Sequence, residues 1–129
     1  MIHPPEARRA QGDAAEDRAC RHLEGSGFTI VDRNFRTRGG EIDIVARKGD
    51  VLAFVEVRSR EVPGFGTPEE SVTPAKRRRI VVAARRYLST VPPSSWGEAR
   101  FDVIAIEGSG EAAVLRHYPA AFDARGKAL

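Results

Sequence analysis

Cysteine is nearly absent from this chain, and long apolar runs are absent altogether. A single Cys20 among 129 residues excludes an internal disulfide and a zinc site built on several cysteines. No apolar run approaches the ~18 residues that a membrane-spanning helix needs. The first residues also lack the apolar segment of a secretory signal. The sequence therefore predicts a cytoplasmic protein that does not act at a membrane.

Lysine is scarce as well, because arginine supplies 18 of the 21 basic residues. Arginine makes bidentate contacts to phosphate, which suits nucleic acid. Codon bias in a GC-rich genome explains the same preference equally well, and a net charge of +3 decides little by itself. The clustering of the basic residues along the chain carries more information than their number.

The length suits one domain, residues 1–129, with a core that needs no disulfide. A hydrophobic content of 41% and a charged content of 30% are those of an ordinary globular protein. Residues 1–5 and those from about 119 to 129 read as loosely ordered ends. The pattern between them predicts a helix, three strands, a long helix and two strands. That order predicts a single α/β sandwich around a mixed sheet, with the long helix as a crossover between parallel strands.

Residues 40–58 read as two β-strands that alternate with period two and meet at Gly49-Asp50. Glycine at the first turn position suits a two-residue type II′ turn, which needs a positive φ there. This turn fixes the register of the hairpin and places Asp43 directly opposite Glu56. Like charges so placed destabilise a sheet. Because both lie among apolar residues, the pair predicts a divalent cation held by oxygen ligands.

The same register places Glu41 opposite Arg58. A purely structural interpretation of these four charges stays open. In it, Glu41 and Arg58 pair at a solvated sheet edge, while Asp43 caps a neighbouring loop.

A helix is predicted from about Glu6 to Glu24, ended by the glycines that follow. Its buried stripe is Ala15, Ala19, Cys20 and Leu23. Glu16 lies on this stripe and has no basic residue three or four positions away. A carboxylate on a packing face needs a partner from across the fold. The alternative is that its stem packs while its carboxylate reaches solvent.

A second helix is predicted from Pro74 to about Ser89. Its first turns carry Lys76, Arg77, Arg78 and Arg79. Cations at a helix N-terminus oppose the helix dipole, but a bound anion would reverse that effect. These four residues, with Arg36 and Arg38 ahead of the acidic pair, therefore predict a nucleic-acid contact; a merely solvated basic face is the alternative. Lys76 also follows the buried stripe, so its amine is expected near the sheet.

Two later residues have structural interpretations. Asp102 in the strand predicted over 100–106 is expected to pair with Arg100; the alternative is that it supports the basic residues of the site. His117, in the strand predicted over about 112–118, has no second histidine nearby in sequence and is not expected to be a ligand.

Two segments carry a resemblance, Gly40-Glu41-Ile42-Asp43 and Phe54-Val55-Glu56-Val57-Arg58-Ser59-Arg60. They resemble the YraN family, a bacterial group described as endonuclease-like. The fold of that family is similar to the PD-(D/E)XK nuclease superfamily, which includes archaeal Holliday junction resolvases. The resemblance extends from about Gly12 to Val103 and implies an αβββαβ restriction-endonuclease-like core. It also implies Mg²⁺ or Mn²⁺ bound by Asp43, Glu56 and a helical Glu16, with Glu41 completing the shell through water.

The function implied by the resemblance is a metal-dependent endonuclease acting on phosphodiester bonds of branched or single-stranded DNA. Arg58 departs from the superfamily pattern, in which this position is usually lysine. Arginine can stabilise negative charge but cannot act as a base. The alternative function is a non-catalytic nucleic-acid-binding module on the same fold. The expected partner is nucleic acid, DNA in particular, and the oligomeric state stays open, a homodimer included.

Overall fold

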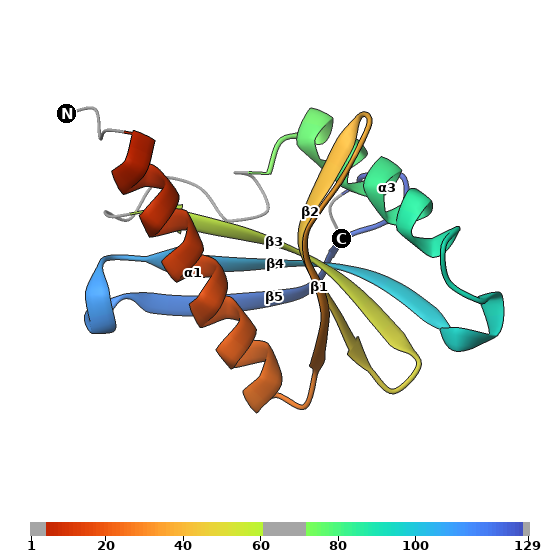
Figure 1. Cartoon of the computed structure of the whole chain (residues 1–129), viewed down its shortest axis with the longest axis horizontal. Helices are drawn as coiled ribbons and strands as arrows, with labels where there is room; N and C mark the ends of the chain where they lie inside the picture. The colour runs from red at the N-terminus through yellow and green to blue at the C-terminus, as the bar shows by residue number, and fades with distance from the viewer. Residues whose placement is uncertain (1–4, 61–71, 128–129) are drawn as a thin grey trace.

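The structure is a computed structural model that describes residues 5–60 and 72–127, with side chains from residue 13 onward. The described residues form a single α/β domain with a five-stranded mixed sheet and two long helices, as predicted (Figure 1). In chain order the elements are α1 (Pro5–Gly25), β1 (Thr29–Thr37), β2 (Gly40–Lys48), β3 (Val51–Arg60), α3 (Pro74–Leu88), η1 (Pro93–Ser95), β4 (Glu98–Glu107), η2 (Gly110–Ala112) and β5 (Val114–Phe122). Residues 1–4 and 128–129, where loose ends were predicted, lie outside the described residues.

The strands are arranged in the order in which they occur in the chain, β1-β2-β3-β4-β5. All neighbours are antiparallel except β3 and β4, which are parallel. A parallel pair needs a long crossover connection, and α3 lies within it, as predicted. The two long helices cover opposite faces, because the side chains of α1 and of α3 belong to separate hydrophobic clusters (Figure 1).

The central hairpin has the predicted register. Its backbone pairs run from Lys48↔Val51 to Ile44↔Val55. Gly49 has a φ of 60°, and Asp50 is not among the residues with a positive φ, as a type II′ turn requires.

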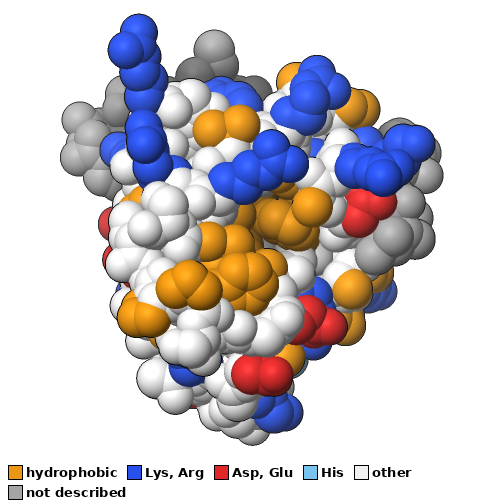
Figure 2. All heavy atoms as spheres, turned by 90° about the vertical axis from the view of Figure 1, so that its right-hand side faces the viewer, with side chains coloured by type: hydrophobic (Ala, Val, Ile, Leu, Met, Phe, Trp, Pro, Cys, Tyr) orange, Lys and Arg blue, Asp and Glu red, His pale blue; other side chains and the backbone are white. Residues whose placement is uncertain are grey.

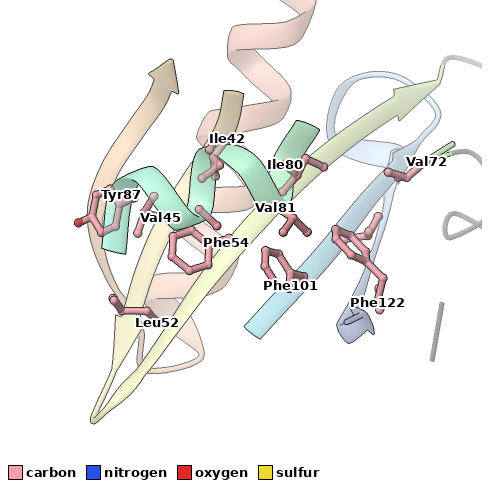
Figure 3. Close-up of a cluster of buried hydrophobic side chains, with 14 residues drawn as sticks. Ile42, Val45, Leu52, Phe54, Val72, Ile80, Val81, Tyr87, Phe101 and Phe122 are labelled. Atoms are coloured by element: carbon pink, nitrogen blue, oxygen red, sulfur yellow. The ribbon is translucent and has the colours of Figure 1, made fainter. Parts of the chain in front are cut away.

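The helix α3 is anchored by aromatic and branched side chains (Figure 3). The stripe predicted for this helix packs on the face of the sheet that carries Phe54 and Phe101; its members Ile80, Ala83, Ala84 and Tyr87 are buried and Leu88 is partly buried. The Tyr87 ring contacts Phe35 and Phe54 edge to face, at centroid distances of 5.3 and 5.8 Å. Burying each large apolar side chain contributes about 1.5–3 kcal/mol, so this packing holds α3 against the sheet.

The helix α1 packs through small residues. Ala15, Ala19 and Cys20 are buried together with Leu23, as the stripe predicted. None of the helices in the described parts of the chain has the length and apolarity needed to cross a membrane.

The last strand continues past Pro119, where the sequence pattern predicted a loosely ordered end. β5 reaches Phe122, whose ring stacks on Phe101 at a centroid distance of 5.1 Å. Ala121 and Phe122 are both buried. The strand extends because these apolar side chains complete the core, even though Ala120 takes a positive φ of 52°.

The contact between α3 and the start of β2 depends on Gly40. A Cβ at this position would lie 2.0 Å from the backbone oxygen of Arg79 and 3.2 Å from the Ala83 Cβ. Backbone cannot yield as a flexible side chain can, so only glycine lets the helix approach here.

Gly40→Ala should therefore lower the free energy of unfolding by about 1–3 kcal/mol or more, the cost of overpacking, as measured by urea denaturation. Gly25→Ala is the matched control, because a Cβ at Gly25 meets nothing within 4 Å. Equal stability of the two variants would contradict the close contact.

Candidate functional site

The sheet opens between β2 and β3. Their backbone pairs end at Ile44↔Val55, although β2 begins at Gly40 and β3 runs on to Arg60. Beyond that point β2 stays paired with β1 as far as Gly40, and β3 stays paired with β4 as far as Arg60. We call this opening the fork. Asp43 and Glu56 are the first residues beyond the last pair, so both acidic side chains stand where the strands part.

At the fork, the Asp43 side chain takes the place of a backbone hydrogen-bond acceptor. Its Oδ2 accepts a hydrogen bond from the Val57 N–H at 2.8 Å. Burial raises the pKa of Asp43, while the Val57 N–H, a hydrogen bond with the Glu56 carboxyl and the charge of Lys76 lower it. The structural alternative is thus met in part: Asp43 caps backbone, but that of the neighbouring strand rather than of a loop.

Glu56 is a nearly buried carboxylate, with 4% of its side chain exposed. Burial, and then the charge of Asp43, raise the pKa of Glu56 to about 7, although Lys76 and Arg58 act in the opposite direction. The Lys76 Nζ lies 2.8 Å from the Glu56 Oε1. Lys76 therefore reaches the sheet, as its place on the helix stripe predicted.

Glu16 finds its partners across the fold, as predicted. Its Oε1 accepts a hydrogen bond from the Asn34 Nδ2 at 3.1 Å, and the Arg33 Nη2 lies 3.6 Å away. Burial, and then the charge of Asp43, raise the pKa of Glu16. The carboxylates of Glu16 and Asp43 therefore influence each other electrostatically.

The three predicted metal ligands do not form one tight cluster. Within residues 5–60 and 72–127, no three side chains of His, Cys, Asp or Glu lie close enough together to hold a metal ion. Asp43 interacts with Glu56 and with Glu16, so the set is a carboxylate pair with a third carboxylate nearby. Such a pair still fits Mg²⁺, which keeps several waters and binds through one or two carboxylates plus substrate phosphates.

The predicted pairing of Glu41 with Arg58 is corrected. The Glu41 Oε2 lies 3.7 Å from the Arg36 Nε, and both side chains are largely exposed. The strands have already parted before the register reaches these positions, so extrapolating it from the turn fails here. Arg58 is half-buried and acts on Glu56, since its charge lowers the pKa of that carboxyl.

The predicted basic residues divide into two groups. Lys76 turns toward Glu56, whereas Arg78 and Arg79 are exposed. Arg36 and Arg38 are also exposed, and the contact of Gly40 with Arg79 brings their turn beside the start of α3. The Arg77 Nε is buried and has no hydrogen-bond partner among the described residues. Figure 2 shows Lys and Arg side chains along the upper part of the face that it presents, above an apolar area.

A polar network away from the fork was missed by the sequence patterns. Arg100 pairs with buried Asp102 as predicted, at 2.9 Å between Nε and Oδ1. The His117 Nε2 also lies 2.8 Å from the Asp102 Oδ2, and the His22 Nε2 lies 3.1 Å from the His117 Nδ1. No spacing rule joins His22 to His117, because they come from α1 and β5. The one available signal was that Asp102 shares the strand face of Ile104, which packs toward α1.

The fold and the fork define a small α/β protein whose sheet opens at a pair of acidic side chains. The chain belongs to a family described as "Uncharacterised protein family UPF0102", whose family model matches residues 15–106. A UPF0102 protein of Myxococcus xanthus is 47% identical over 120 residues, which is 93% of this chain and 94% of the relative. One from Dechloromonas aromatica is 52% identical over 99 residues, covering 77% of this chain and 80% of the relative.

The raised pKa of Glu56 predicts a pH-dependent loss of stability in buffer without divalent cations. In the unfolded chain Glu56 ionises near pH 4.5, whereas in the folded chain it ionises near about pH 7. The raised pKa of Glu56 therefore adds to the free energy of unfolding below pH 4.5, and this added stability is lost as the pH rises through about 7. The loss is on the order of 3 kcal/mol.

Glu56→Gln should lack this loss, so its stability relative to the native protein should rise between pH 4.5 and pH 8. Urea denaturation at a series of pH values measures the difference, with exposed Glu98→Gln as the control. A constant difference across that range would show that Glu56 titrates normally.

Proposed function

We propose that this protein is a metal-dependent endonuclease that hydrolyses phosphodiester bonds of DNA at the fork. The observation that carries the proposal is the Asp43–Glu56 pair, held beside the Lys76 amine where the sheet opens. A nearly buried carboxylate next to a second one costs folding free energy, which a protein of purely structural role could avoid with apolar residues. The resemblance to the YraN family and the PD-(D/E)XK nucleases supports the same chemistry.

Asp43 and Glu56 would hold Mg²⁺ or Mn²⁺, and Glu16 and Glu41 would act on the ion through water. When bound, such a cation supplies Lewis-acid stabilisation of phosphate charge and makes water more acidic. The residues themselves supply oxygen ligands of the kind that these ions prefer. The Asp43 Oδ2 is already fixed by the Val57 N–H, so one ligand is held in place before the cation arrives.

Lys76 supplies the amine that the superfamily motif places on the strand. Arg58 occupies the motif position, but it cannot deprotonate. The Lys76 Nζ reaches the Glu56 Oε1 from α3 at 2.8 Å. With a cation on Glu56, the Lys76 amine would turn to the attacking water or the scissile phosphate. Arg58 would add positive charge at the same place.

DNA would approach along the exposed arginines around the fork. Arg78 and Arg79 lie in the second turn of α3, Arg36 lies near the end of β1, and Arg38 lies in the β1–β2 turn beside the helix. Phosphates held there would lie next to the carboxylate pair. Branched or single-stranded DNA is the substrate class that the family resemblance favours.

A nucleic-acid-binding module without catalysis is the second candidate. The Lys76–Glu56 ion pair favours it, because Lys76 already neutralises Glu56 without any metal. The two candidates differ in one respect that can be measured, which is cleavage.

The proposal predicts Mn²⁺-dependent cleavage of branched or single-stranded DNA by the native protein. Asp43→Asn and Lys76→Met should each lower the cleavage rate by about 100-fold or more, because each removes a charge that acts on the transition state. Arg58→Lys should leave the rate nearly unchanged, since Lys76 supplies the amine. The exposed substitution Glu98→Gln is the control.

Absence of cleavage by the native protein on all of these substrates, with binding intact, would overturn the nuclease in favour of the binding module. Gain of activity in Arg58→Lys would show instead that the motif position itself requires the amine.

The proposal also predicts that DNA binding depends on Arg78 and Arg79. Each phosphate contact contributes about 0.7 to the salt slope on single strands and about 0.9 on duplex DNA. Replacing both arginines with glutamine should therefore weaken binding and flatten the slope by about 1.4 on single strands. Arg85 and Arg86, exposed in the last turn of α3, give the matched double substitution. If the two variants bind alike, the DNA contact lies on another face.

A further inference from the structure

A second polar site lies between α1 and β5, apart from the residues of the fork. It is an open pocket of about 480 Å³ lined by Arg18, Arg21, His22, Leu115 and His117. That volume lies in the range of small-molecule sites. Of the five lining residues, two are arginines and two are histidines, and none is acidic.

Hydrogen bonds fix the tautomers of both histidines. The Asp102 carboxylate can only accept, so the His117 Nε2 carries the proton of their 2.8 Å contact. In neutral His117 the Nδ1 is then an acceptor, and the His22 Nε2 donates to it at 3.1 Å. The remaining ring nitrogen, Nδ1 of neutral His22, is left with a lone pair. Asp102 is itself held by Arg100 and by the Ala120 N–H.

Arg18 carries an unsatisfied donor. Its Nη1 is buried and has no hydrogen-bond partner among the described residues. A buried donor of a charged group left without an acceptor costs more than a neutral one. Because this nitrogen is shielded from solvent, a ligand would reach it only after the Arg18 side chain turned toward the pocket that it lines, and an acceptor there would then remove that cost.

We propose that this pocket binds a phosphate ester, with Arg18 and Arg21 pairing with the phosphate oxygens and His22 donating to them when protonated. Guanidinium groups match phosphate geometry. The pocket is open to solvent and leaves room beside the phosphate for the organic part of an ester. The inference does not depend on nuclease activity at the fork.

Binding of a dianion here is coupled to a proton. Burial, and then His117, lower the pKa of His22, so its ring is neutral near pH 7. Arg18 and Arg21 on α1 line the same pocket as His22, while Asp102 lies behind His117 on β4. The negative charge of a bound dianion favours the protonated ring and so raises the pKa of His22. Affinity therefore increases as pH falls.

Titration calorimetry with deoxyadenosine 5′-monophosphate, and with deoxyadenosine as its uncharged match, tests the site. We expect only the phosphate ester to bind, and Arg18→Gln or Arg21→Gln to weaken binding by about tenfold each, as loss of one charge-assisted hydrogen bond does. Arg85→Gln removes one exposed charge elsewhere and should have no effect. Arg21 is itself exposed, so its variant tests the site even if Arg18→Gln fails to fold.

Sulfate has a constant charge between pH 6 and pH 8, so any pH dependence of its affinity reports the protonation of His22. Its affinity should fall as pH rises, and NMR titration should show the pKa of His22 raised by sulfate. Single-stranded DNA with and without a 5′-phosphate distinguishes a strand end from a free phosphate ester as the source. No saturable binding of the monophosphate at millimolar concentration, or equal affinity in Arg21→Gln and Arg85→Gln, would overturn the proposal.

Discussion

The arrangement at the fork rests on one hydrogen bond, from the Val57 N–H to the Asp43 carboxylate. Where two strands part, backbone donors lose their ladder partners and need others. The Asp43 side chain supplies such a partner. The same hydrogen bond holds the Asp43 carboxylate beside Glu56. Like-charged groups are thereby held together by the fold. Burial raises the pKa values of Asp43, Glu56 and Glu16, and the charge of Asp43 raises those of Glu56 and Glu16 further.

The two layers of helix contribute differently to this region. α3 comes close to the sheet because Gly40 has no side chain, and the resulting contact with Arg79 brings Lys76 within reach of Glu56. α1 approaches through alanines and presents Glu16 from the other side. A carboxylate pair at the open end of a sheet is thus supported from both faces, while each helix keeps an ordinary apolar stripe for packing.

Turn chemistry and side-chain periodicity predicted the parts of the fold that depend on residues close together in the chain. The Gly49-Asp50 turn fixed the register as far as Ile44↔Val55, since each pair in an antiparallel ladder follows from the one before. The same rule misplaced Glu41 and Arg58, because strand divergence is set by packing on α3 and not by the turn. The extension of β5 to Phe122 and the contact of His22 with His117 depend on side chains distant in sequence, so periodicity alone could not reveal them.

The parallel pairing of β3 with β4 has a consequence for the order of folding. The β1–β2–β3 meander closes through short turns, so its contacts are local and can form early. The partners across β3 and β4, such as Val51 and Glu98, are separated by the whole of α3 and its flanking segments. Closing that long loop costs entropy before any contact repays it. The core between β3 and β4 should therefore set the folding rate, with α3 docking as the step that commits the chain.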